Sequence, residues 1–271
     1  MSFNLMILAA DPQSAAEAQC AKIDRIFYDL EYINKAERQR GRNTVISNNN
    51  INDIPSVREV LTSSKLLVRT NPIHAYTADE VEKAISYGAD ILMLPMVMSY
   101  KDVEQYVNYV GDRAKVCIMI ETAQALARID DILSVQGVDE LFIGLNDLHI
   151  SMGLSFMFEL LSGGLVEYVA DKCREKNMPF GFGGIARIGD GMLPAEKILA
   201  EHVRLGSSSV ILSRTFKGEV GDNAGKKIDL SEEVGKVRKT MENIKCWGKN
   251  DFLNNQRCIS QTVKQIVTNL L

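Results

Sequence analysis

Two acidic residues, Glu121 and Asp147, each follow an apolar run that is typical of a buried strand. The runs are KVCIMI before Glu121 and ELFIGLN before Asp147. A buried carboxylate is unfavourable by several kcal/mol unless a cation or hydrogen bonds offset its burial. Two carboxylates on adjacent strands suit Mg²⁺ or Mn²⁺, which accept water and substrate oxygens as further ligands. The residues therefore predict one divalent metal at this pair. They leave open that each acid instead caps a helix or pairs with an arginine.

A second set of polar residues ends two earlier apolar runs. Arg69 closes KLLVR, and Asp29 and Glu31 close RIFYDLE. An arginine fork can bind a substrate carboxylate through two parallel hydrogen bonds. An ion pair from Arg69 to Asp29 or Glu31 is an equally good interpretation of the same residues. The two acids are also candidates for polarising a water molecule or a base.

Further candidates follow other runs. His74 and His149 come shortly after Arg69 and Asp147, and both are candidate acids or bases. The chain contains no HxH or HExxH pattern, so a zinc hydrolase site is not expected. Arg187 lies in the glycine-rich segment GFGGIARIGDG, residues 181–191, which precedes a helix. Backbone N–H groups at such a position can hold an anion, and a plain tight turn is the alternative.

The scaffold that would bring these side chains together is an alternation of short apolar runs and amphipathic helices. Eight such cycles predict a parallel sheet that closes into a (β/α)₈ barrel, with its active site at the C-terminal ends of the strands. An open, doubly wound sheet is the structural alternative. For the third strand, 65–71 is preferred over 43–47. The expected strands are 4–10, 25–31, 65–71, 90–97, 115–122, 140–147, 180–185 and 209–216.

The chain is expected to divide into two parts. Residues 1–220 hold the barrel, and residues 221–271 form a C-terminal helical extension that packs on the barrel or on a neighbouring subunit. A polar, glycine-rich segment follows Phe216, and two helical patterns, about 231–247 and 250–271, lie outside the eight cycles.

Composition narrows the class of protein. With 271 residues, one barrel of about 250 residues fits with little left over. The net charge of −4 argues against a nucleic-acid-binding protein, which usually carries a basic excess. Five widely spaced cysteines without a CxxC pattern indicate free thiols in a reducing compartment. No signal peptide or membrane span is apparent, so a cytoplasmic location is expected.

The run VCIMIETAQALARIDDILSVQGVDELFIGLNDLHISMG, residues 116–153, resembles the metal-site region of the HpcH/HpaI aldolase and citrate lyase beta-subunit family. The spacing of 26 residues from Glu121 to Asp147 (147 − 121) matches that family. Upstream, DRIFYDLE resembles the family's D-x-E strand, LLVRTNP its substrate-arginine strand, and YGADILMLPMV its G-A-D element. The resemblance covers roughly residues 20–216.

The resemblance implies a class II, metal-dependent aldolase or lyase. Glu121 and Asp147 would be the metal ligands, and Arg69 would hold the substrate carboxylate or enolate oxygen. Backbone N–H groups of the turn that contains Gly144, Asn146 and Asp147 would bind the substrate carboxylate. Asp29 and Glu31 would surround this site with acidic groups. Independently of the resemblance, the polar loop that contains Arg187 indicates a sugar-acid or phosphorylated second substrate bound by that arginine.

Two residues depart from the family pattern. Tyr32 stands where the bacterial aldolases of this group carry a histidine, and Met119 stands where they tend to have glutamine. The base is therefore open between His74, His149 and a metal-bound water.

The sequence therefore predicts a Mg²⁺- or Mn²⁺-dependent carbon–carbon lyase that forms a metal-stabilised enolate of pyruvate or a related 2-oxo acid. A sugar or sugar acid is the candidate aldehyde, and the resemblance implies a homo-oligomer, a trimer or hexamer. The first alternative is a CoA-thioester lyase of the citrate-lyase type. Its CoA phosphates would bind a basic cluster that is otherwise a solvated surface: Lys35, Arg38, Arg40 and Arg42. The second alternative is a non-catalytic, metabolite-binding barrel.

Overall fold

The chain folds into a closed barrel of eight parallel strands in sequential order, each hydrogen-bonded to its neighbours in the chain, with the eighth beside the first. The computed structural model describes residues 3–38, 48–219, 225 and 228–270. The predicted (β/α)₈ fold is confirmed, and the open-sheet alternative is wrong because strand eight pairs with strand one. The alternative third strand, 43–47, lies outside the described residues.

All eight predicted strands are present, and most end two to four residues earlier than the apolar runs suggested. Each strand ends where the polypeptide leaves the sheet at the mouth of the barrel. The strands are β1 (Asn4–Leu8), β2 (Arg25–Asp29), β3 (Lys65–Arg69), β4 (Ile91–Leu94), β5 (Lys115–Ile120), β6 (Glu140–Ile143), β7 (Phe180–Ile185) and β8 (Ser209–Leu212).

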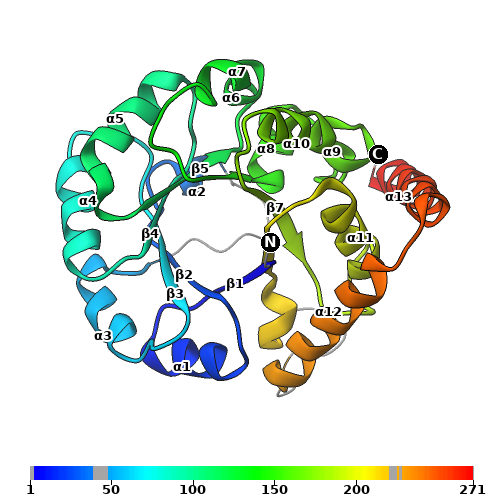
Figure 1. The fold of residues 1–271 in the computed structure, drawn as a ribbon, viewed down its shortest axis with the longest axis horizontal. Coiled ribbons are helices and arrows are strands. Elements are labelled where there is room, and N and C mark those ends of the chain that lie inside the picture. The colour runs from blue at the N-terminus through cyan, green and yellow to red at the C-terminus, as the bar shows by residue number, and fades with distance from the viewer. Residues whose placement is uncertain (1–2, 39–47, 220–224, 226–227, 271) are drawn as a thin grey trace.

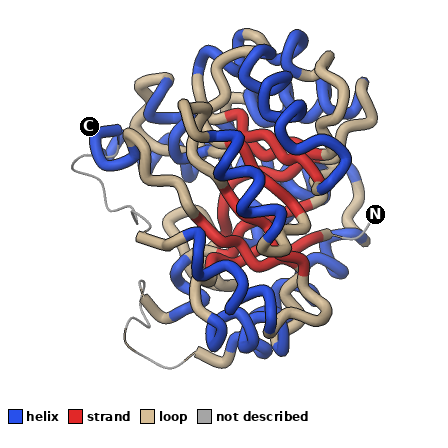
Figure 2. The backbone as a smooth tube through the Cα atoms, turned by 90° about the vertical axis from the view of Figure 1, so that its left-hand side faces the viewer, coloured by secondary structure: helices blue, strands red, loops and turns tan. Residues whose placement is uncertain are grey.

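Helices surround the strands as an outer ring, which Figure 1 shows from one end and Figure 2 from the side. None of the helices in the described ranges is long and apolar enough to cross a membrane. The α-helices are α1 (Pro12–Cys20), α2 (Lys35–Arg38), α3 (Ile54–Glu59), α4 (Thr77–Ser86), α5 (Tyr100–Val110), α6 (Ala123–Ala127), α7 (Ile129–Ile132), α8 (Leu145–Ser151), α9 (Glu159–Ser162), α10 (Leu165–Glu175), α11 (Ala195–Leu205), α12 (Leu230–Lys245) and α13 (Lys249–Leu270).

The two C-terminal helices have different positions. Helix α12 contacts α11, α1 and the short 3₁₀ helix after β8, so it fills the eighth place in the ring. Helix α13 contacts α11 and α9 from outside the ring, at the right of Figure 1. The expectation was that both helices lie outside the eight cycles. In the structure only α13 does, because α12 covers the gap between α11 and α1.

The barrel interior is filled by side chains from alternate positions of the strands. It contains Met6, Phe27, Leu67, Ile91, Met93, Cys117, Met119 and Phe142, all at most 3% exposed. At the N-terminal end of the strands, Arg25 forms a two-pronged ion pair with Glu140 across the barrel, at 2.5 and 2.9 Å. This buried pair closes the lower end, so the polar residues at the upper end face a single opening.

His202 gives a testable consequence of this packing. Its ring is fully buried and stacks on Phe182 with 3.7 Å between centroids, and burial lowers its pKa from 6.5 to about 3. The unfolded chain therefore binds a proton that the folded chain rejects, and stability is lost as the pH falls below about 6.5. We expect His202 to account for about 2 kcal/mol of the loss in unfolding free energy between pH 7.5 and pH 5.

Urea unfolding at both pH values measures this loss. A His202→Leu variant should show a flatter dependence on pH, whatever its absolute stability. An unchanged slope would contradict the assignment.

Candidate active site at the mouth of the barrel

A buried cluster of four charged side chains lies at the C-terminal ends of β2 and β3. Asp29 and Arg69 are register partners on these strands. Arg69 donates from Nε to Asp29 Oδ1 at 2.8 Å and from Nη2 to Asp29 Oδ2 at 2.7 Å. Glu31 Oε2 lies 3.3 Å from Arg69 Nη2. The ion pair that the sequence left as an alternative for Arg69 is therefore formed, and it involves both Asp29 and Glu31.

Lys35 is the fourth member of the cluster. Its Nζ donates to Asp29 Oδ2 at 2.9 Å and lies 3.3 Å from Glu31 Oε2. The Lys35 side chain is only 4% exposed, and those of Asp29 and Glu31 are 3% and 0% exposed. Burial alone would raise the pKa of Asp29, but Arg69 and Lys35 outweigh it and hold that pKa well below the usual range. The two acids and two cations balance in formal charge.

The turn between β2 and α2 is built to direct Lys35 back over the strand. Asn34 adopts a left-handed backbone with φ of 58°, which asparagine tolerates better than most residues. Asn71 Oδ1 accepts hydrogen bonds from the N–H groups of Tyr32 and Ile33, at 3.0 and 3.1 Å. The Tyr32 side chain is 61% exposed and therefore lies outside the buried cluster.

Arg69 keeps one edge of its guanidinium for other partners. Nε and Nη2 are taken by the two acids, whereas the partner of Nη1 within the described residues is the sulfur of Met119, at a weak 3.8 Å. Met119 is two residues before Glu121, and the charge of Glu121 raises the pKa of Arg69 further. The open edge of the fork is therefore on the side of Glu121.

Glu121 is the first residue after β5, and it is 1% exposed. Its pKa is raised to about 8, first by burial and then by the negative charges of Glu31 and Asp147. The Met96 N–H donates to Glu121 Oε1 at 2.8 Å from a left-handed backbone with φ of 54°. Such a conformation is unfavourable for a non-glycine residue by about 1–2 kcal/mol. The loop after β4 therefore adopts a strained backbone at Met96, and this conformation directs the Met96 N–H to the Glu121 carboxylate.

Asp147 lies on a helix rather than at the end of a strand. Strand β6 stops at Ile143, and α8 begins at Leu145, so Asn146 and Asp147 are in the first helical turn. Asp147 is 7% exposed, and its charge raises the pKa of Glu121. Gly144 donates its N–H to Ile120 O at 3.1 Å, so this predicted substrate donor is already in use. The N–H groups of Asn146 and Asp147 belong to the first turn, where helices lack internal acceptors.

A divalent cation fits the charge and the donors of this site. Glu121 and Asp147 place two carboxylates in a buried setting, where a cation offsets the unfavourable burial of negative charge. Within the described ranges, no group of three or more His, Cys, Asp or Glu side chains is arranged to hold a metal by itself. Two carboxylates suit Mg²⁺ or Mn²⁺, whose other ligands are commonly water and substrate oxygens.

Gly144 gives a direct test of that fit, because a side chain there would displace Glu121. A Cβ at this position would lie 2.5 Å from Glu121 Oε2 and 2.8 Å from its Cβ. We expect Gly144→Ala to weaken Mn²⁺ binding by about tenfold or more, a size typical of disturbed ligand support. Calorimetric titration with Mn²⁺ measures it. Gly235→Ala is the matched control, since its Cβ would meet nothing within 4 Å. Equal Mn²⁺ affinity in both variants would argue against Glu121 as a ligand.

The two remaining candidates near the mouth are held by local partners. His74 Nδ1 lies 2.9 Å from Thr77 Oγ1 and 3.1 Å from Pro72 O. These local contacts engage Nδ1 and not the second ring nitrogen, Nε2. His149 is buried in α8, with Nδ1 at 3.2 Å from Leu145 O. Both lie on elements that follow the C-terminal ends of strands, as predicted.

Arg187 lies in the loop after β7, where it donates to Asp190 Oδ2 at 2.7 and 3.1 Å. Its backbone N–H donates to Thr215 Oγ1, which ties this loop to the one after β8. Arg187 is 6% exposed, and its charge is paired with that of Asp190. This pairing weakens the case for an anion site there.

Sequence reasoning missed the role of Lys35, which it had placed in a basic surface cluster. That placement is wrong for Lys35, because its ammonium is buried between two carboxylates. Arg40 and Arg42 lie outside the described residues, as does the side chain of Arg38. The available signal was the spacing, since Lys35 follows Glu31 by four residues and pairs with it as i and i+4.

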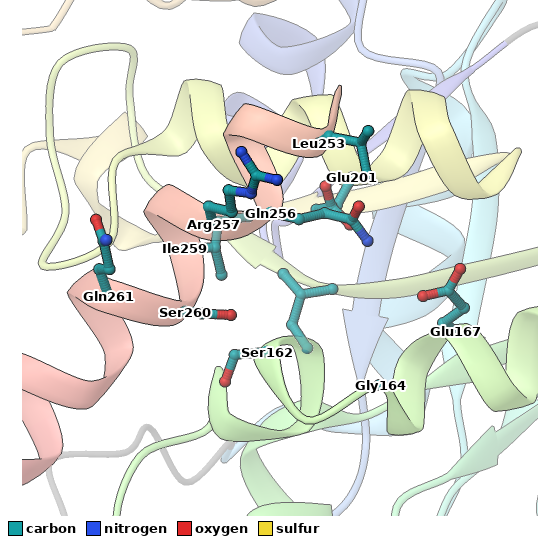
Figure 3. Close-up of a pocket in the computed structure, with 11 residues that line it drawn as sticks. Ser162, Gly164, Glu167, Glu201, Leu253, Gln256, Arg257, Ile259, Ser260 and Gln261 are labelled. Carbon is teal, nitrogen blue, oxygen red and sulfur yellow. The ribbon is translucent and has the colours of Figure 1, made fainter. Parts of the chain in front are cut away.

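A separate cavity of about 460 Å³ lies between α13 and the segment α9–α11, and Figure 3 shows its lining. Glu201 and Glu167 face it from the barrel side, but both are already paired with Arg204. None of the predicted site residues lines this cavity. The two acids that line this cavity are therefore already paired within the protein. The mouth of the barrel remains the candidate site.

Comparison with known proteins places the same region in a family. The family model described as HpcH/HpaI aldolase/citrate lyase matches residues 3–159. A hydroxypyruvate/pyruvate aldolase of Rhizorhabdus wittichii is 44% identical over 52 residues, which are 19% of this chain and 21% of that protein. A hydroxypyruvate/pyruvate aldolase of Sagittula stellata is 29% identical over 105 residues, 28% of this chain and 42% of that protein. The matches therefore span less than half of these relatives.

Solved structures agree on the architecture. The HpcH/HpaI aldolase of Desulfitobacterium hafniense superposes with a TM-score of 0.59 at 16% identity, covering 92% of this chain and 95% of that one. At this identity the match supports the fold alone.

Proposed function

Since this chain belongs to the HpcH/HpaI aldolase/citrate lyase family, we propose that it is a divalent-metal-dependent carbon–carbon lyase acting on 2-oxo acids. The reaction makes or breaks a bond next to the enolate of pyruvate or a close relative. An aldehyde is the second substrate, with a sugar or sugar acid as the candidate. A homo-oligomer and a cytoplasmic location are part of the same proposal.

The observation that carries this proposal is the arrangement of Arg69 beside the acidic pair. Two acids hold its Nε and Nη2, and Nη1 is directed to the side of Met119 and Glu121. A donor held in this way does not need to reorganise when negative charge develops on a substrate oxygen. Cleavage of an aldol bond leaves such charge on the enolate oxygen.

Each group then has a role. A divalent cation held by Glu121 and Asp147 would act as a Lewis acid towards the substrate oxygens. Arg69 would bind the carboxylate or enolate oxygen through Nη1. The first-turn N–H groups of Asn146 and Asp147 would donate to the substrate carboxylate, where the helix start favours an anion.

The candidates for proton transfer in this proposal are His74, His149 and a metal-bound water. The Nδ1 contacts of His74 fix its ring, so Nε2 is the nitrogen available to exchange a proton. His149 is held more tightly within α8. Unchanged turnover in both His74→Ala and His149→Ala would exclude both residues as the base.

The CoA-thioester alternative loses support from Lys35, since that ammonium is engaged with Asp29 and Glu31. The non-catalytic alternative has to account for a buried pair of acids and an oriented arginine, which a binding barrel does not require.

Deuterium uptake into the methyl group of pyruvate, followed by proton NMR, tests the proposal. We expect exchange with Mg²⁺ or Mn²⁺ and none with chelator. A folded, metal-loaded protein that leaves the methyl signal unchanged would exclude pyruvate as the nucleophile. Retention on an acyl-CoA affinity column would then favour the CoA alternative.

A further inference from the structure

Lys35 is a buried charged group beside the candidate site that the proposed reaction does not use. Lysine is almost never buried unless it is paired, because its ammonium is strongly hydrated. Here the side chain is 4% exposed although it begins a short helix next to an exposed turn. A lysine at such a place would ordinarily extend into water, so its inward direction needs a cause.

That cause is the set of hydrogen bonds around the turn. Asn71 holds the N–H groups of Tyr32 and Ile33, and Asn71 is itself held by Glu80 at 2.7 and 3.0 Å. On the other side, Asn49 Nδ2 donates to Asp29 O at 2.9 Å. The backbone that carries Lys35 is therefore fixed before any substrate arrives.

The charge of Lys35 changes what Arg69 can offer to a substrate. Lys35 places one positive charge 2.9 Å from Asp29 and 3.3 Å from Glu31, the two acids that hold the guanidinium of Arg69. Removing Lys35 would make the surroundings of Arg69 more negative by one formal charge. In a buried setting, added negative charge behind the guanidinium repels an incoming carboxylate and weakens its binding. With Lys35 in place, more of the positive charge of Arg69 is available to a substrate at the Nη1 edge.

We propose that Lys35 is a positioning residue that acts through Asp29 and Glu31, so that Arg69 can bind the carboxylate or enolate of an anionic substrate. The inference rests on the proposed function in naming a 2-oxo acid. The claim about binding does not depend on the reaction: anion binding at the mouth of the barrel requires the positive charge at position 35. Lys35 itself forms no bond with the substrate.

A covalent role for Lys35 is a different idea and is separable by experiment. Lysine nucleophiles are activated by apolar surroundings or by a nearby cation. Lys35 instead has carboxylate oxygens at 2.9 and 3.3 Å. We therefore expect no adduct at Lys35 when the protein is treated with pyruvate and borohydride. A mass increase at that residue would overturn the positioning role.

The principal test compares three variants of the full chain. Lys35→Gln removes the charge and keeps an N–H donor for Asp29, whereas Lys35→Arg keeps the charge. Lys65→Gln is the matched control, because Lys65 also pairs with an aspartate, Asp90, at 3.0 Å, but is 65% exposed at the opposite end of β3. Mn²⁺ affinity is measured first for each protein. Oxalate, a planar dianion like the enolate of pyruvate, is then titrated calorimetrically into the Mn²⁺-loaded proteins.

We expect Lys35→Gln to weaken oxalate binding about tenfold or more and to raise the KM for pyruvate exchange more than it lowers kcat. Lys35→Arg should restore oxalate affinity to within about threefold, and Lys65→Gln should match the wild type. Equal oxalate affinity in wild type and Lys35→Gln would overturn the proposal. So would a loss of kcat alone.

Failure of the proposed function has a different signature. A wild type that does not exchange pyruvate, yet binds oxalate in a way that depends on the charge at position 35, would contradict the reaction and support the role of Lys35. If Lys35→Gln does not fold, Lys35→Arg still tests the charge. A folded Lys35→Arg variant that has lost oxalate affinity overturns the proposal.

Discussion

Replacing Glu121 with glutamine should lower metal-dependent deuteration of pyruvate by at least about 1000-fold, because one of the two proposed protein ligands for the cation is removed. Asp147→Asn should have a similar effect. Both changes keep the shape of the side chain, and both acids are at most 7% exposed, so the variants test charge rather than packing. The rate is followed by proton NMR at saturating Mn²⁺, after the Mn²⁺ affinity of each variant has been measured by calorimetry.

Glu140→Gln is the matched control for this result. Glu140 is also a buried barrel acid, but it lies at the other end of the strands, where it pairs with Arg25. This variant should lose stability and retain the exchange rate per folded molecule. Full activity in Glu121→Gln, or an equal loss in Glu140→Gln, would contradict the metal assignment.

Replacing Arg69 with methionine should reduce pyruvate exchange about 100- to 1000-fold, the loss typical for removing one donor from a developing oxyanion. The variant should also lose about 3–5 kcal/mol of unfolding free energy, because Asp29 and Glu31 would lose a buried cationic partner. Arg69→Lys should keep most of that stability and still lose activity, since an ammonium has a single nitrogen and lacks the planar fork that holds Asp29 through Nε and Nη2 while Nη1 faces the substrate.

The control for Arg69 is Arg25→Met. Arg25 forms a two-pronged pair with Glu140 at 2.5 and 2.9 Å, as Arg69 does with Asp29. Removing Arg25 should cost comparable stability in urea unfolding without altering the KM for pyruvate. A KM that rises equally in both variants would mean that the effect of Arg69 is only structural.

The barrel and its strands were predictable because their signal is local. Parallel strands covered on both faces appear as continuous apolar runs, and a run such as KVCIMI needs no partner to be recognised. The clustering of Arg69 with Asp29 was one of two even alternatives, and the register of β2 and β3 decided it. For His74, His149 and Arg187 the predicted roles remain predictions.

Other features depended on contacts between distant segments. The runs of apolar residues continued beyond the true strand ends, so the sequence could not separate β6 from the helix that carries Asp147. The eighth helix of the ring, α12, follows a long polar segment, and only its contacts with α11 and α1 identify it. The left-handed backbone at Met96 has no marker in the sequence, because methionine is not a residue that favours it.

The amino-acid sequence alone was sufficient for the order of the elements, the end of the barrel at which the candidate site lies, and the two acids 26 residues apart. These properties follow from hydrophobic period and from the rule that parallel strands point their C-terminal ends to one face. Only the tertiary structure shows which cation pairs with which acid. It places Lys35 in the buried cluster with Asp29 and Glu31 rather than on the surface. Lys35 is buried because Asn71 holds the preceding turn by a hydrogen bond to Tyr32, 39 positions away in the chain. No local sequence pattern reveals a contact between residues so far apart.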